Sequence, residues 1–77
     1  MEITTLVRIP VYGLGCGGAG ARTIERELAR SEGVRRVYVN PVIETAYVDY
    51  DPAETGPSVL VEVIERAGYR AGRPVEA

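Results

Sequence analysis

The residue of this 77-residue chain best suited to chemistry is its single cysteine, Cys16. It stands in a glycine-rich segment, Gly13-Leu14-Gly15-Cys16-Gly17-Gly18-Ala19, between a strand-like and a helix-like pattern. Glycines leave the thiol uncrowded and the backbone N–H groups accessible, as a loop that presents sulfur to an ion or partner requires. A helix that begins just after Cys16 would favour the thiolate through its free N–H groups and its dipole. The same residues are also consistent with a flexible turn that holds a small hydrophobe.

The composition removes most other chemistry. The chain has no His, and all nine of its basic residues are Arg, so the commonest general base and every amine nucleophile are absent. We therefore expect no enzymatic activity. The formal net charge is −2 with basic and acidic residues interspersed, which offers no basic stripe to nucleic acid. Asp49 and Asp51 could suggest a site for a hard cation, but Asp49-Tyr50-Asp51-Pro52 is better interpreted as a strand that ends in a turn.

The length predicts one domain, residues 1–77, with a small core. A content of 45% hydrophobic and 26% charged residues is typical of a globular, soluble domain. No apolar run reaches the roughly 20 residues that a membrane span requires, so we expect no membrane insertion. The N-terminus does not resemble a secretory signal, and a lone cysteine cannot form an internal disulfide, which together favour a cytoplasmic location.

Hydropathy patterning predicts six elements. Alternation predicts strands over residues 5–11, 36–39 and 45–50, and apolar stripes of helical period predict helices after the glycine-rich segment and near Pro57. Gly33 and Gly68 are expected to end these helices, with Thr55-Gly56-Pro57 as the candidate N-terminal cap of the second. A short last strand covers residues 69–71, and residues 72–77 are expected to fray. Pro10 predicts a bulge, or a position where no neighbour needs an N–H donor.

The order strand, helix, strand, strand, helix, strand is the split βαβ pattern. It predicts an α+β fold, a ferredoxin-like βαββαβ sandwich with a four-stranded antiparallel sheet and both helices on one face. The first and third strands would be central. The apolar side chains that face each other across the two layers form the predicted core: Val7, Ile9, Val11, Ile24, Leu28, Val37, Val39, Val48, Leu60 and Ile64.

With this topology and loop, the chain resembles the heavy-metal-associated domain family of small copper chaperones, mercury-binding proteins and N-terminal modules of metal pumps. Several segments carry the resemblance: Val11, Gly13-Leu14, Cys16, Gly33-Val34, Val37, Val39-Asn40, Ala46, Val48, Tyr50-Asp51 and Ala67-Gly68-Tyr69. The resemblance places Cys16 on the first cysteine of the family's Cys-x-x-Cys metal loop and implies a role in metal ion transport. It also makes Gly13, Leu14, Gly15, Gly17, Gly18 and Ala19 loop residues. Tyr69 matches a family aromatic that could shield the thiolate or simply fill the end of the core.

The chain departs from the family at Ala19, which occupies the position of the second cysteine. A soft ion such as Cu(I) requires two thiolates, so we expect a weakened or shared site for copper or another thiophilic ion, and no nucleotide. Sharing would involve a metal-bridged homodimer or a metal-transport partner with its own Cys-x-x-Cys. Two alternatives stay open, namely a metal-blind protein-interaction module and a redox-active single thiol.

Overall fold

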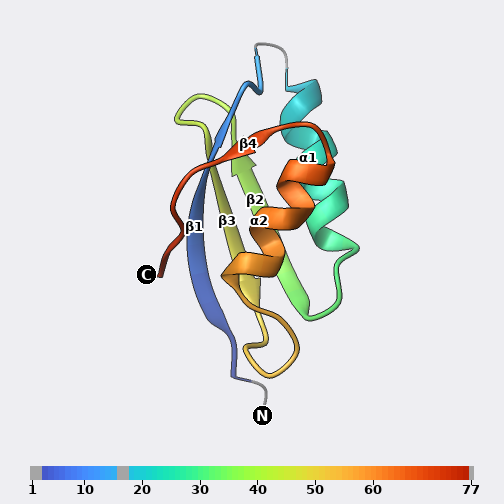
Figure 1. The fold of residues 1–77 in the computed structure, drawn as a ribbon, viewed down its shortest axis with the longest axis vertical. Coiled ribbons are helices and arrows are strands. Elements are labelled where there is room, and N and C mark those ends of the chain that lie inside the picture. Colours follow the sequence, from blue (N-terminus) through green and yellow to red (C-terminus); the bar gives the residue numbers. More distant parts are fainter. Residues whose placement is uncertain (1–2, 16–17, 77) are drawn as a thin grey trace.

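The computed structural model describes residues 3–15 and 18–76 of the chain. Their elements follow in the order β1 (Thr5–Tyr12), α1 (Ala19–Ala29), β2 (Val34–Asn40), β3 (Thr45–Tyr50), α2 (Pro57–Arg66), β4 (Arg70–Ala71) and β5 (Val75–Glu76) (Figure 1). The strands form an antiparallel sheet in the order β2-β3-β1-β4, and β5 also pairs with β1. The ferredoxin-like α+β fold, with β1 and β3 central, is therefore confirmed.

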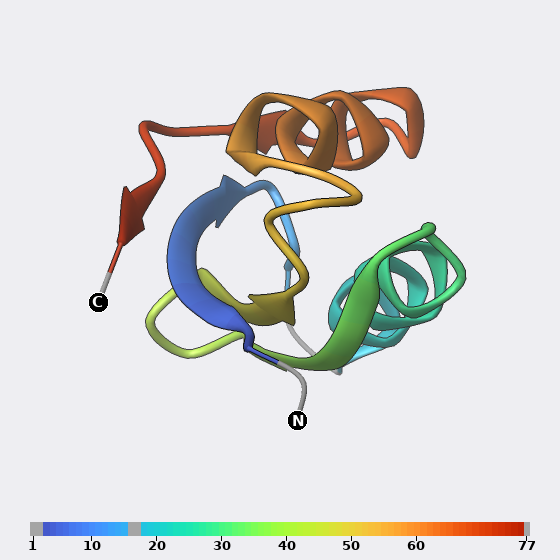
Figure 2. The same ribbon diagram turned by 90° about the horizontal axis from the view of Figure 1, so that it is seen from below.

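Both helices cover the same side of the curved sheet (Figure 2). Alternate residues of the strands point to that side, and they form one buried cluster with the apolar stripes of α1 and α2. The predicted core is confirmed, although Val37 is only partly buried. Full burial of a side chain of this size contributes about 1.5–3 kcal/mol, which is how a sheet this small is held together. The cluster is Val7, Ile9, Val11, Leu14, Ala21, Ile24, Leu28, Val39, Ala46, Val48, Tyr50, Leu60 and Ile64.

Pro10 lies inside central strand β1, where a missing donor would normally weaken the sheet. The N–H of Val11 donates to the carbonyl of Glu44 on the β3 side at 2.9 Å, so residue 10 faces the opposite neighbour, the C-terminal segment. There the carbonyl of Pro10 accepts from the N–H of Gly72 at 2.8 Å, just where β4 has ended and β5 has not begun. The register of β1 against this segment also shifts by one residue, from Val11–Ala71 to Arg8–Val75, so the irregularity predicted at Pro10 lies in this pairing.

The C-terminal segment differs from the expected frayed tail. Residues 75–76 form β5, which pairs with Val7 and Arg8 of β1. The hydroxyl of Tyr50, a core residue, donates to the carboxylate of Glu76 at 3.0 Å and ties β5 to the sheet. The prediction of fraying was wrong for residues 72–76 because it considered local pattern only, whereas these contacts come from β1 and β3.

Helix ends are formed mainly by backbone geometry. Gly68 adopts a φ of 100°, and the N–H groups of Gly68 and Tyr69 donate to the carbonyls of Glu65 and Ile64, which closes α2 as a Schellman motif. Pro57 occupies the first turn of α2 as predicted, but the capping residue is Gly56 and no side chain caps the helix. The Thr55 hydroxyl is buried without a hydrogen-bond partner among the described residues. No helix in the described part of the chain is long and apolar enough to cross a membrane.

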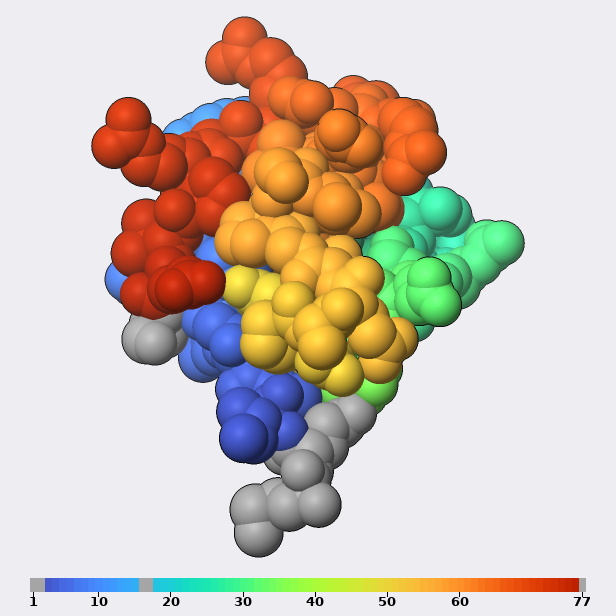
Figure 3. All heavy atoms as spheres, turned by 60° about the horizontal axis from the view of Figure 1, so that its bottom comes forward, coloured from blue at the N-terminus to red at the C-terminus, as the bar shows by residue number. Residues whose placement is uncertain are grey.

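The connection from β3 to α2, residues 51–56, is tied down by polar contacts. The N–H of Asp51 donates to the carbonyl of Gly33 at 2.8 Å, and its carboxylate accepts from the N–H of Ala53 at 2.9 Å. Arg35 reaches the carboxylate of Glu54 at 2.8 Å. Figure 3 shows this connection (yellow to orange) against the turn that precedes β2 (green).

Edge strand β2 has its outer side partly occupied by α1. The carboxylate of Glu25, on α1, accepts a hydrogen bond from the backbone N–H of Val39 at 2.9 Å. The strand is also irregular between Val34 and Arg36, where its register against β3 shifts.

Candidate metal-binding loop

Residues 13–18 connect the end of β1 to the start of α1, as the sequence predicts. The backbone of Gly13, Gly15 and Gly18 has φ values of 87°, 72° and 80°, in the left-handed region that glycine tolerates best. Apart from its chain neighbours, a Cβ at Gly13 or Gly15 would meet none of the described residues within 4 Å, so backbone conformation explains glycine there. Cys16 and Gly17 lie outside the described residues. The predicted position of the Cys16 thiol at the rim therefore stays a prediction.

Leu14 anchors the loop to the protein. Its side chain is 6% exposed and belongs to the core cluster, although the sequence predicted it only as a loop residue. The first turn of α1 packs closely over it, because a Cβ at Gly20 would lie 2.8 Å from the carbonyl oxygen of Leu14. Any side chain at position 20 would push α1 away from the base of the loop.

Tyr69 reaches the same base from the connection between α2 and β4. Its hydroxyl would be 3.0 Å from a Cβ at Gly20, and its ring packs partly buried against the core cluster. The structure thus brings Tyr69, Leu14 and the start of α1 together, as the resemblance implies. A contact between Tyr69 and the thiol of Cys16 stays a prediction. Tyr12 lies on the other face of the sheet and is 43% exposed.

Ala19 is the first residue of α1 and is exposed. Because it carries only a methyl group, it adds no ligand to the loop. Across the described residues, no group of three or more His, Cys, Asp or Glu side chains is arranged to hold a metal ion. Besides Cys16, the sequence has no further cysteine and no histidine.

Two charged side chains border the loop, and the sequence pattern predicted neither of them there. A guanidinium nitrogen of Arg22 lies 3.4 Å from where a Cβ of Gly18 would stand. The carboxylate of Glu44 accepts a hydrogen bond from the N–H of Gly13 at 3.3 Å. Arg22 is one helical turn from the loop and could have been inferred. Glu44 comes from the distant β2–β3 hairpin, and no local pattern indicates it.

The alternative cation site at Asp49 and Asp51 is not supported by the contacts. The Asp51 carboxylate is engaged by the N–H of Ala53 and lies 3.7 Å from Arg35, while Asp49 points to the outer side of β3. The interpretation of this segment as a strand followed by a turn is confirmed.

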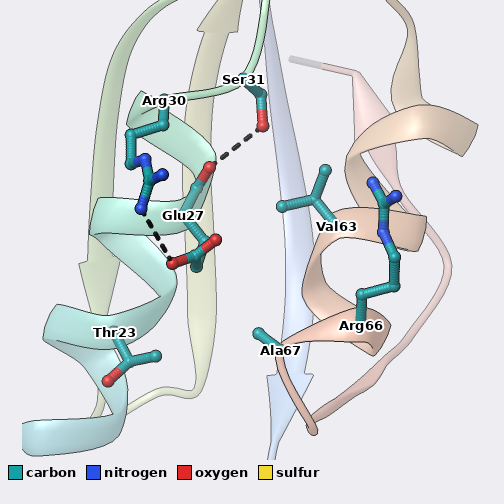
Figure 4. A pocket seen from close by; sticks show the side chains of 7 residues that line it. All are labelled: Thr23, Glu27, Arg30, Ser31, Val63, Arg66 and Ala67. Carbon is teal, nitrogen blue, oxygen red and sulfur yellow. Dashed lines mark hydrogen bonds and ion pairs between the residues drawn. The ribbon is translucent and has the colours of Figure 1, made fainter.

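A hollow between α1 and α2 is also unsuited to a soft metal (Figure 4). Its carboxylate, Glu27, lies 3.7 Å from the guanidinium of Arg30, and the Ser31 hydroxyl donates to the Glu27 carbonyl at 3.0 Å. The described residues that line this hollow carry no sulfur or imidazole. They are Thr23, Glu27, Arg30, Ser31, Val63, Arg66 and Ala67.

Fold and loop together define a class: a small ferredoxin-like domain whose β1–α1 connection is rich in glycine and carries one cysteine. The model of the heavy-metal-associated domain matches residues 9–70, which is most of the chain. The chain belongs to the heavy-metal-associated domain family, and this membership supports a role in heavy-metal handling.

Known relatives agree with this assignment. The chain is similar to the copper-exporting P-type ATPase of Bacillus subtilis, with 44% identity over 63 residues, 82% of this chain and 8% of that protein. It therefore spans only a small part of this relative's length. Among solved structures, a copper binding domain from HMA7, a P-type ATPase, superimposes with a TM-score of 0.87 at 26% identity, covering 94% of this chain and 96% of that one. The N-terminal domain of a potential copper-translocating P-type ATPase from Bacillus subtilis, in the Cu(I)-loaded state, gives 0.83 at 35% identity, with 90% and 85% covered.

Proposed function

We propose that this domain handles a soft metal ion, with Cu(I) the first candidate, through a site to which Cys16 contributes the only thiolate of the chain. One observation carries the proposal: a member of the heavy-metal-associated family has alanine at position 19, and its sequence offers no other cysteine or histidine. The names of the relatives, which are copper-exporting and copper-binding, favour copper as the ion.

The second ligand then comes from a second molecule. Cu(I) is a soft ion that selects thiolate and thioether ligands, and one thiolate leaves its coordination incomplete. Either Cys16 of a second copy or a cysteine of a Cys-x-x-Cys metal-transport protein can complete it. Such a shared site suits transfer, because a metal held between two proteins can leave with either of them. The proposed role is metal handling in the cytoplasm, where thiols stay reduced, and not catalysis.

Several features of the described loop support this use. Gly13, Gly15 and Gly18 bring no side-chain bulk to the approach of a partner, and Ala19 is exposed beside them. Leu14 holds the base of the loop in the core, so the loop is anchored although its tip is built from small residues. Arg22, beside Gly18, adds a positive charge that favours a thiolate at this end of the molecule.

Stoichiometry tests the proposal. The protein is titrated anaerobically with Cu(I) against a competing chromogenic chelator, while the molecular mass is followed by light scattering. We expect about one ion per two chains and a metal-dependent doubling of the mass, with no binding by Cys16→Ser. Tight monomeric binding of one ion per chain would contradict the shared site. Equal behaviour of the wild type and Cys16→Ser would contradict metal handling and favour a metal-blind interaction module.

A further inference from the structure

The β2–β3 hairpin brings one acidic residue to the start of the cysteine loop. The hairpin lies at the same end of the molecule as the end of β1 (Figure 1). There Glu44 makes two contacts with the segment that leads into the loop. Its carbonyl accepts from the N–H of Val11 at 2.9 Å, and its carboxylate accepts from the N–H of Gly13 at 3.3 Å. One residue from a distant hairpin thus holds both the C-terminal end of β1 and the first residue of the loop.

The backbone of Glu44 is unusual. Its φ is 50°, and it is the one non-glycine residue among those described with a positive φ. Left-handed backbone is unfavourable for a residue with a Cβ and persists where the surroundings determine it. Here the hairpin is braced from within. The Asn40 side-chain oxygen accepts from the N–H groups of Val42 and Ile43 at 2.9 and 3.4 Å, and the Thr45 hydroxyl donates to the Ile43 carbonyl at 2.9 Å.

Gly13 depends on this contact. It is exposed, its φ is 87°, and a Cβ built on it would meet no described residue other than its chain neighbours within 4 Å, so no described side chain packs there to hold it. Leu14, which follows, is fixed in the core. The loop therefore leaves β1 between two attachment points, the Glu44 carboxylate at Gly13 and the buried side chain of Leu14.

We propose that Glu44 is a positioning residue for the metal loop, holding Gly13 so that the loop leaves β1 in one direction. This rests on the proposed function of the loop, but its structural part does not need metal. The carboxylate acts through the Gly13 N–H and is not itself a metal ligand. A glutamine side chain can accept the same hydrogen bond without the charge, so Glu44→Gln should preserve the function and Glu44→Ala should not.

The first experiment measures amide hydrogen exchange of the metal-free protein by NMR. In Glu44→Ala and Glu44→Gly we expect the Gly13 amide to exchange about two- to tenfold faster, the range for the loss of one ordinary hydrogen bond. Glu44→Gln should restore most of the protection. The Val11 amide is bonded to the main chain of residue 44 and reports whether the hairpin is intact. Glu44→Gly keeps a residue that tolerates positive φ, so this variant stays informative if Glu44→Ala disturbs the hairpin.

A matched control is Glu62→Ala, which removes an exposed glutamate of α2. It should leave the Gly13 amide unchanged. The proposal is overturned if the Gly13 amide exchanges at the wild-type rate in both Glu44→Ala and Glu44→Gly. This outcome does not depend on the Cu(I) affinity of the protein.

The second experiment compares Cu(I) affinity in the same variants of the full chain. We expect about a two- to tenfold loss in Glu44→Gly, wild-type affinity in Glu44→Gln, and no effect in Glu62→Ala. An equal loss in Glu44→Gln would mean that charge and not position matters, and would contradict the proposal. Faster exchange of the Gly13 amide in Glu44→Gly with an unchanged Cu(I) affinity would also contradict the proposal. If the wild type binds no Cu(I), the proposed function fails, while the exchange result still decides whether Glu44 holds Gly13.

Discussion

The two connections that lead from a central strand into a helix occupy equivalent places in the fold but are built in opposite ways. Residues 51–56, between β3 and α2, contain a side-chain turn at Asp51, main-chain hydrogen bonds and an ion pair to Arg35. Residues 13–18, between β1 and α1, are mostly glycine, and the hydrogen bond from Gly13 to Glu44 is the one side-chain bond found in their described part.

This difference separates structural from functional requirements within one architecture. The β3–α2 connection is closed by local turn chemistry: an aspartate begins a turn, and a proline begins the helix. The β1–α1 connection forgoes these contacts. Glycines stand in their place, and a Cβ at Gly13 or Gly15 would meet no described atom within 4 Å, which agrees with the proposal that this loop admits a partner.

Restoring the missing ligand gives the largest expected effect. Ala19→Cys places a second thiol on the described first turn of α1, so one chain can supply both ligands. Converting a second, intermolecular ligand into an intramolecular one typically raises affinity about 10²–10⁴-fold. Chelator competition should show this gain, and light scattering should show a monomer with one ion. Unchanged affinity would mean that the loop lacks the geometry of a metal site.

Gly33, which packs against the β3–α2 connection from the turn before β2, and Gly15, inside the β1–α1 connection, should respond differently to a methyl group. A Cβ at Gly33 would lie 2.9 Å from the Glu54 side chain and 3.0 Å from that of Thr55, at a φ of 88°. Clash and strain together should lower the free energy of unfolding of Gly33→Ala by about 2–4 kcal/mol. Gly15→Ala meets only the strain, about 1 kcal/mol. Urea denaturation measures both, and equal losses would contradict the view that the β3–α2 connection is the packed one.

Removing the turn at Asp51 should have a smaller effect. Asp51→Ala loses the hydrogen bond from Ala53 and the contact with Arg35, both partly solvent-exposed, for about 1–2 kcal/mol of unfolding free energy. The neighbouring Asp49→Ala is the control, because a surface substitution of this kind usually stays within about 0.5 kcal/mol. If the two variants are equally stable, the polar contacts of this connection do not contribute to the free energy of unfolding.

Replacing Tyr50, the residue directly before that connection, should have the smallest effect on the free energy of unfolding, and this effect should depend on pH. Burial first, and then the hydrogen bond and negative charge of Glu76, raise the pKa of the Tyr50 hydroxyl above 10.0 in the folded protein. The folded state therefore binds this proton more tightly than the unfolded chain, and its stabilisation is present below pH 10 and lost as the pH rises further. Tyr50→Phe should cost about 0.5–1.5 kcal/mol at neutral pH. Denaturation against pH should show this difference shrinking above pH 10.

Sequence patterns predicted most of the fold because the physics involved is local. Alternation in β1 and β3, the stripes of α1 and α2, and the terminator at Gly68 each depend on residues within a few positions of one another. The family resemblance, which the family model confirms, located the loop from a short motif of neighbouring residues.

Long-range contacts account for what the sequence did not show. Nothing near Val75 indicates that β1 pairs with it, nor that Tyr50 holds Glu76. The sequence around Glu44 indicates only a residue between two strands. Folding is what brings the Glu44 carboxylate to the N–H of Gly13. The ligand role of Cys16 stays a prediction from sequence and family.

The hydrogen bond from Val39 to Glu25 has a consequence for aggregation. Strand β2 forms one edge of the sheet, and an exposed edge strand is a template onto which other chains can add. Because Glu25 already accepts from the Val39 N–H, an incoming strand would find that donor occupied and a negative charge in its path. Open-ended stacking of copies through β2 is thereby discouraged. The metal-bridged dimer proposed above, which would assemble at the loop before the N-terminal end of α1, would then form without competition from fibre-like association.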